Sequence, residues 1–170
     1  MVVVDKTFRN REEAGKQLAR RLKNYAKKDV VVYALPRGGV VVGAEVARAL
    51  QAPLTILTAR KIGHPDFPEF AIAAVSQDGY VVKDEEAVLS IGEDKFDELL
   101  EDAQVEAERR HNLYLKGIPV PDVAGKIAII VDDGLATGLT IRAAISDLRL
   151  RKPKKIILAV PVAPDILVAA

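Results

Sequence analysis

The stretch from Ile127 to Ile141, IAIIVDDGLATGLTI, most constrains the fold that this 170-residue chain can adopt. Ile127 to Val131 is an unbroken apolar run, which is typical of a parallel strand buried on both faces of a sheet. Asp132 and Asp133 follow directly, and because isolated charges are costly to bury, they should lie where the strand leaves the core. Glycines, threonines and a helical spacing of apolar residues come next. The stretch therefore predicts a buried strand, an acidic pair, a small-residue loop and a helix.

The loop after the acidic pair suits a phosphate. Free backbone N–H groups and the positive end of the helix dipole converge at a helix N-terminus. Gly134 and Gly138 allow the backbone to approach a ligand closely, and Thr137 and Thr140 supply hydroxyl donors. Acidic residues beside such a loop are explained if the ligand also presents sugar hydroxyls or a divalent cation.

Two common phosphate loops are excluded by the residues present. Leu139 stands where a P-loop requires lysine, and the spacing of Gly134 and Gly138 does not match the dinucleotide fingerprint GxGxxG. The segment IIVDDGLATGLT instead resembles the phosphoribosyl pyrophosphate signature of the type I phosphoribosyltransferases. The alternative that involves no ligand is a capped helix after a core strand.

Strands and helices alternate along the rest of the chain, which predicts a parallel α/β sheet. The apolar run Val30 to Leu35 ends in the sequence PRGG, with Arg37 at the carboxyl end of the expected strand. Ligands of such sheets bind beyond the carboxyl ends of the strands. Arg37 and the acidic pair should therefore face one crevice if their strands are neighbours. The other expected elements are strands at 2–4, 54–58 and 156–160 and helices at 11–28, capped by Asn10, at 40–50 and at 93–115.

Residues 60 to 82 interrupt this alternation. The segment 60–70 is too irregular for a helix and too polar for a core strand, whereas 71–75 and 81–82 predict a hairpin. A long excursion of this kind is a natural lid. Its sequence and that of the first hairpin strand, RKIGHPDFPEFAIAAV, resemble an uncharacterised branch of phosphoribosyltransferases in bacteria and archaea. His64 in this segment is either a general acid or base or an ordinary loop residue.

The resemblance implies an α/β fold of the type I phosphoribosyltransferase kind, in which a parallel sheet is flanked by helices and carries a hairpin and lid insertion around residues 60–82. It implies the Mg²⁺-dependent transfer of 5-phosphoribose from phosphoribosyl pyrophosphate to a nucleobase or related nitrogen acceptor, with release of pyrophosphate. A homodimer is expected from the resemblance alone.

The resemblance also assigns roles to residues. Asp132 and Asp133 would hold the ribose hydroxyls and Mg²⁺. Arg37, with the backbone amides of Gly38 and Gly39, would bind the pyrophosphate. Lys61 and Arg60 would close over it from the lid. The 5′-phosphate would be held by Gly134, Leu135, Ala136, Thr137, Gly138 and Thr140. The catalytic candidates are Arg37, Lys61, Asp132 and Asp133.

Two departures from the family pattern bear on the acceptor. Ala136 stands where the 6-oxopurine enzymes have an aspartate base, which argues against hypoxanthine or guanine. Relatives continue past the last strand into a segment that helps to complete the base site, so we expect residues 1–170 to form a single domain that is C-terminally short. A non-catalytic module that binds phosphoribosyl pyrophosphate or a nucleotide is therefore the alternative to an enzyme.

Composition excludes several other classes of function. The net charge of +1 and an aromatic content of 5% do not favour nucleic-acid binding. The chain has no cysteine, which excludes disulfides, thiolate metal sites and a cysteine nucleophile. We expect no membrane span and no signal peptide, and hence a cytoplasmic protein.

Overall fold

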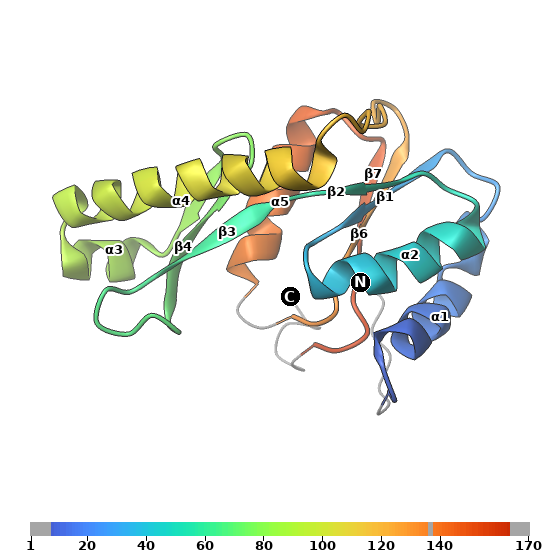
Figure 1. Cartoon of the computed structure of the whole chain (residues 1–170), viewed down its shortest axis with the longest axis horizontal. Helices are drawn as coiled ribbons and strands as arrows, with labels where there is room; N and C mark the ends of the chain where they lie inside the picture. The colour runs from blue at the N-terminus through green and yellow to red at the C-terminus, as the bar shows by residue number, and fades with distance from the viewer. Residues whose placement is uncertain (1–7, 136–137, 164–170) are drawn as a thin grey trace. The chain divides into compact units, whose positions relative to one another are not determined.

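The computed structural model describes residues 8–135 and 138–163 of the chain (Figure 1). The chain divides into two compact units. The first unit comprises Met1–Ile56, Pro119–Ala136 and Arg151–Ala170, and the second comprises Leu57–Ile118 and Thr137–Leu150. The expectation of a single domain stays a prediction.

The first unit is built on a parallel sheet of four strands in the order β2-β1-β6-β7. Its strands are β1 (Val30–Ala34), β2 (Leu54–Ile56), β6 (Ile127–Val131) and β7 (Lys155–Ala159). Ala34 at the end of β1 pairs in register with Val131 at the end of β6. The predicted class, a parallel sheet flanked by helices, is confirmed, and the two strands that precede the candidate site residues are neighbours.

Helices α1 (Arg11–Arg21) and α2 (Gly38–Leu50) pack against each other in this unit, and a short 3-10 helix, η1 (Lys23–Tyr25), follows α1. Asn10 caps α1 as predicted, because its side chain accepts a hydrogen bond of 2.9 Å from the backbone N–H of Glu13. The helix ends at Arg21 rather than at residue 28. The core of the unit joins the apolar faces of both helices to Val32, Ile129 and Ile157, which lie in one row across the sheet.

The second unit contains an antiparallel sheet in the order β3-β4-β5. Its elements are β3 (Ala59–Gly63), β4 (Ala71–Ser76), β5 (Val81–Lys83), α3 (Glu85–Ile91), α4 (Glu93–Leu115) and α5 (Leu139–Leu150). All six residues of β4 are buried, and since successive residues point to opposite faces, both faces of this strand are covered. Helices α3, α4 and α5 all contact β4 and so provide this cover.

The segment 60–70 corrects one expectation. It was expected to be irregular, but β3 occupies its first part and pairs with β4. Polar Arg60 and Lys61 are compatible with a strand here because β3 lies at the edge of its sheet, where only Ile62 is fully buried. The hairpin that follows is confirmed as β4 and β5, and α4 has the predicted bounds. Helix α3 was not anticipated, and the strand expected at 2–4 lies outside the described residues.

Among the helices of the described residues, none combines the length and the apolar character that a membrane span requires.

Gly43 allows α2 to pack closely against β1, and its replacement gives a test of the fold. A Cβ atom at this position would lie 2.9 Å from the Cβ of Ala34, closer than side-chain atoms normally approach. We expect Gly43→Val to lower the free energy of unfolding by about 1 to 3 kcal/mol through overpacking. Urea unfolding followed by circular dichroism measures this change. Ala49→Val, at an exposed position of the same helix, is the matched control, and equal losses in the two variants would contradict the close packing.

Candidate functional site

The candidate site of the first unit lies where β1 and β6 end. Asp132 and Asp133 follow β6 directly, and the PRGG loop follows β1. The backbone N–H of Leu35 donates to the carbonyl of Val131 at 2.9 Å, which extends the pairing of the two strands by one residue. The two loops therefore start at the same level of the sheet. The Pro36–Arg37 peptide bond is cis.

Gly38 and Gly39 bring the start of α2 against the acidic pair. A Cβ atom on Gly39 would lie 2.8 Å from the carbonyl oxygen of Val131 and 2.9 Å from the Cα of Asp132. A Cβ atom on Gly38 would overlap the carboxylate of Asp133. Any larger side chain would therefore push the helix away. The first N–H groups of α2 have no acceptor within the helix, so they are donors beside two carboxylates and can serve an anionic ligand.

Arg11, which the sequence analysis missed, completes this arrangement. Its Nε donates to Oδ2 of Asp133 at 2.7 Å, and the backbone N–H of Asp133 donates to Oδ1 of Asp132 at 2.8 Å. Arg11 is the first residue of α1, and 122 positions separate it from Asp133. No local pattern connects residues so far apart, so only the folded chain reveals this ion pair.

The two carboxylates differ in their electrostatic environment. Burial raises the pKa of Asp132 to about 7, the hydrogen bond from Asp133 N–H opposes this shift, and the negative charge of Asp133 adds to it. The ionised form of Asp132 is thus disfavoured until a cation or hydrogen-bond donors approach it. Two adjacent carboxylates fit Mg²⁺, which takes one or two protein carboxylates and completes its shell with water and substrate phosphate oxygens. The described residues contain no group of three or more side chains suited to hold a metal on their own.

Arg37 is exposed, and its side chain forms no hydrogen bond or ion pair with any described residue. It is therefore available to a ligand.

The phosphate loop starts beside the segment that follows β7, because Leu135 N–H donates to the carbonyl of Val162 at 3.0 Å. Gly134 is within 3.9 Å of the same carbonyl, measured from the position its Cβ would take. The expected phosphate ligands Ala136 and Thr137 lie outside the described residues.

The other predicted site residues belong to the second unit. The carbonyl of Gly138, whose φ is +79°, accepts the first hydrogen bond of α5 from Arg142 N–H at 2.9 Å. Thr140 lies in the first turn of α5 and lines a pocket of about 610 Å³ together with Arg60 and Lys61. The structure thus brings these three predicted residues to one pocket. Lys61 Nζ donates to the backbone carbonyl of Glu69 at 3.3 Å and lies 3.7 Å from its carboxylate.

The pocket also contains residues that the sequence analysis missed. Arg110 lines it, and Glu106 joins Arg110 to Arg60 through ion pairs. The i, i+4 spacing of Glu106 and Arg110 on a predicted helix was the signal that could have revealed the first of these pairs.

Comparisons with known proteins identify the family of the chain. The family model described as the phosphoribosyl transferase domain matches residues 6–166. The chain belongs to the phosphoribosyl transferase family. Proteins from two Mycobacterium tuberculosis strains, CDC 1551 / Oshkosh and ATCC 25618 / H37Rv, are named provisionally as phosphoribosyl transferases and are 43% identical over 166 residues. These residues are 96% of this chain but 38% of each relative.

Two solved structures show the same architecture. A protein of Thermus thermophilus, TT1426, is 35% identical with a TM-score of 0.78, over 96% of this chain and 79% of that chain. A purine phosphoribosyltransferase from Pyrococcus horikoshii Ot3 matches with a TM-score of 0.53 and 19% identity, over 94% of this chain and 77% of that one. The second likeness concerns the fold alone.

The raised pKa of Asp132 predicts how stability depends on pH. A carboxyl group with a pKa of about 7 when folded and about 4 when unfolded binds more protons in the native state between these values. Its contribution to stability is therefore present at low pH and is lost as pH rises from about 4 to 7. We expect Asp132→Asn to be more stable than the wild type at pH 8, by about 1 to 3 kcal/mol, and to lose this advantage near pH 4.

Urea unfolding of both proteins from pH 4 to pH 8 measures this difference. Asp97→Asn, at an exposed position of α4, controls for the loss of a negative charge. A difference between Asp132→Asn and the wild type that does not change with pH would contradict the burial of an ionisable group at this position.

Proposed function

We propose that this phosphoribosyl transferase domain moves 5-phosphoribose from phosphoribosyl pyrophosphate to a nucleobase or related nitrogen acceptor, with Mg²⁺, and releases pyrophosphate. The observation that carries the proposal is the meeting of the acidic pair and the PRGG loop at the ends of the paired strands β1 and β6. Carboxylates suit ribose hydroxyls and a divalent cation, whereas the arginine and the helix N-terminus suit a polyanion.

The reaction breaks the bond between the anomeric carbon and a pyrophosphate oxygen and forms a bond from that carbon to a nitrogen of the acceptor. Positive charge develops on the ribose ring while negative charge builds up on the departing pyrophosphate. Groups already fixed where these charges develop lower the barrier most. In our proposal Arg37 and the amides of Gly38 and Gly39 take up the pyrophosphate charge. Charge-assisted hydrogen bonds of this kind contribute about 1.5 to 3 kcal/mol each.

Asp132 and Asp133 would orient the ribose by accepting hydrogen bonds from its hydroxyls. The same two carboxylates would hold Mg²⁺, which would supply positive charge that offsets the negative charge of the pyrophosphate. Arg11 would hold Asp133 in place, since the 2.7 Å ion pair fixes one of its two carboxylate oxygens and leaves the other for a ligand. The raised pKa of Asp132 supports a site that gains its cationic partner only when the ligand binds.

The loop before α5 would hold the 5′-phosphate through Gly134, Leu135, Ala136, Thr137, Gly138 and Thr140. In the second unit, Lys61 and Arg60 would close over the pyrophosphate. Lys61 would then exchange its contacts with exposed Glu69 for contacts with the ligand. A homodimer and a cytoplasmic location stay predictions.

Calorimetric titration with phosphoribosyl pyrophosphate tests the proposal directly. We expect the wild type to bind it more tightly with Mg²⁺ present and the double variant Asp132→Asn/Asp133→Asn to lose at least about tenfold in affinity, because the ligands for ribose and cation are gone. Asp97→Asn, exposed on α4, should bind as the wild type does. A folded wild type that does not bind would contradict the donor site. Binding without pyrophosphate release across a panel of nucleobases would instead support the non-catalytic module.

Arg11 offers a finer test of the same site. We expect Arg11→Gln to weaken binding of phosphoribosyl pyrophosphate by about two- to fivefold, because a part-exposed ion pair that orients a ligand contributes up to about 1 kcal/mol. Arg9→Gln is the matched control: Arg9 also forms an exposed ion pair near the start of α1, but with Glu13 rather than with Asp133. Equal affinities of the two variants would remove Arg11 from the site.

A further inference from the structure

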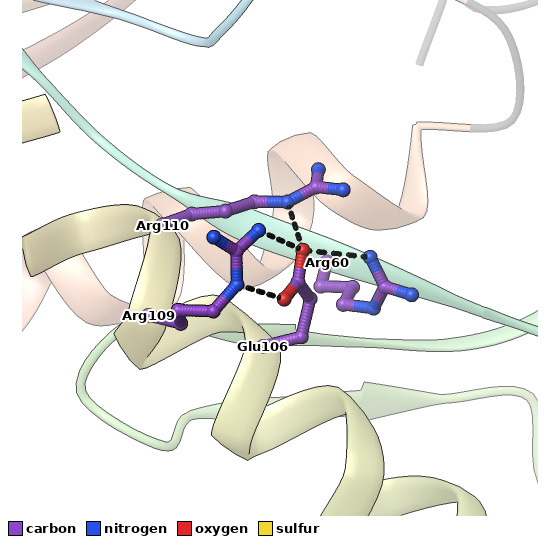
Figure 2. Close-up of polar contacts among 4 residues, drawn as sticks. All are labelled: Arg60, Glu106, Arg109 and Arg110. Carbon is purple, nitrogen blue, oxygen red and sulfur yellow. Dashed lines mark hydrogen bonds and ion pairs between the residues drawn. The ribbon is translucent and has the colours of Figure 1, made fainter. Parts of the chain in front are cut away.

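Three arginines surround one carboxylate in the second unit. Figure 2 shows Glu106 on α4 between Arg109 and Arg110 of the same helix and Arg60 of β3. The hydrogen bonds from Arg109 and then Arg110 lower the pKa of Glu106 to about 2, so this group is ionised at any working pH. It neutralises one of the three positive charges. An excess of positive charge therefore remains within this group of four side chains.

The two arginines of α4 use their guanidinium groups differently. Arg109 binds Glu106 through two nitrogens, with Nε at 2.5 Å from one carboxylate oxygen and Nη2 at 2.9 Å from the other. Arg110 binds it through Nε alone, at 2.7 Å. Its terminal nitrogens form no hydrogen bond or ion pair with any residue that the structure describes, and Figure 2 shows them turned away from the carboxylate. Arg109 thus uses both sides of its guanidinium group to bind Glu106. Arg110 is held by Glu106 through Nε, and its two terminal nitrogens remain available.

Arg110 lines the pocket of about 610 Å³ along β3. Arg60, Lys61, Arg110 and His64 line it together with Glu69 and Thr140. Glu69 pairs with Lys61, while Arg60 and Arg110 share the single negative charge of Glu106 with Arg109. Positive charge is therefore in excess among these side chains. Leu99, Pro65 and Pro68 add apolar wall. Arg109 does not line this pocket but a separate one, near the C-terminal end of α4.

We propose that this pocket binds a small molecule through an oxyanion, either a carboxylate or a phosphate, and that Arg110 and Arg60 are its cationic contacts. The pocket volume is in the range of small-molecule sites, and the mixture of apolar wall and a few convergent polar groups is typical of them. Planar guanidinium groups match the two oxygens of a carboxylate or phosphate. The carboxylate of an acceptor base and the pyrophosphate of the donor share this chemistry. The choice of an acceptor base and the donor as the two sources of the oxyanion rests on the proposed function. The inference that the pocket binds an oxyanion does not.

Isothermal titration of two probes tests the site and distinguishes the sources. The first probe is orotate, a uracil that carries a carboxylate, with uracil as its neutral counterpart. The second is inorganic pyrophosphate without Mg²⁺. The proteins are the wild type, Arg110→Gln and Arg109→Gln, each checked for folding by circular dichroism and thermal unfolding. The two variants lose the same charge from the same helix and the same carboxylate partner, but only Arg110 lines the pocket.

We expect at least one anionic probe to bind the wild type and to lose about ten- to a hundredfold in affinity in Arg110→Gln, as the removal of one charge-assisted hydrogen bond predicts. Arg109→Gln should change the affinity by less than about threefold. If Arg110→Gln loses affinity for orotate but not for pyrophosphate, the pocket binds an anionic acceptor. If it loses affinity for pyrophosphate but not for orotate, the pocket binds the donor. No anion binding by the wild type, or equal losses in both variants, would overturn the inference.

Failure of this inference and failure of the proposed function have different signatures. Phosphoribosyl pyrophosphate binding that depends on Asp132 and Asp133, in a protein in which neither anionic probe depends on Arg110, would keep the function and remove the oxyanion pocket. Anion binding that depends on Arg110, in a protein that does not bind phosphoribosyl pyrophosphate, would do the opposite.

Discussion

The parallel pairing of β1 with β6 is the constraint on which the candidate site depends. The two strands are paired residue for residue from Val30 and Ile127 to Ala34 and Val131, so their carboxyl ends stop at the same level. Ligand sites of open α/β sheets form at this edge because the loops that leave neighbouring strands converge there. All five residues of β1 are buried, so a slip of one residue would exchange the side chains that pack on the two faces of the sheet. The packing of the core therefore fixes the position of the loops as well.

This edge of the sheet holds opposite charges close together, and small residues make that possible. Gly38 and Gly39 allow the N-terminus of α2 to pack against Asp132 and Asp133. The helix dipole and its free N–H groups are favourable neighbours for carboxylates, and Arg11 adds a full positive charge at Asp133. None of the described residues gives Asp132 such a cation, and burial therefore raises its pKa. The ionised form is thus stabilised at Asp133 and disfavoured at Asp132. Carboxyl groups with a shifted pKa are common at functional sites, where a ligand can supply the missing positive charge.

Much of this arrangement follows from local pattern. Unbroken apolar runs predicted the paired strands, the acidic pair and the PRGG loop could be placed at their ends, and the cap at Asn10 and the bounds of α4 were correct. Contacts over a long separation could not be predicted in this way. Arg11 meets Asp133 across 122 positions, and no period in the sequence encodes that distance. The roles of Arg37, Lys61 and the phosphate loop stay predictions, since they concern a ligand rather than the fold.

The error at β3 has a physical cause that also bears on function. Arg60 and Lys61 made this segment too polar for a core strand, and that reasoning holds for a strand with neighbours on both sides. At an edge, polar side chains are tolerated and even help to prevent pairing with other chains. Arg60 extends toward Glu106 of α4, and Lys61 pairs with Glu69. Arg60 and Lys61, the two charged residues that made the strand hard to predict, also line the pocket along β3. A polar pattern that weakens a prediction of structure can therefore mark the place where a strand serves a ligand.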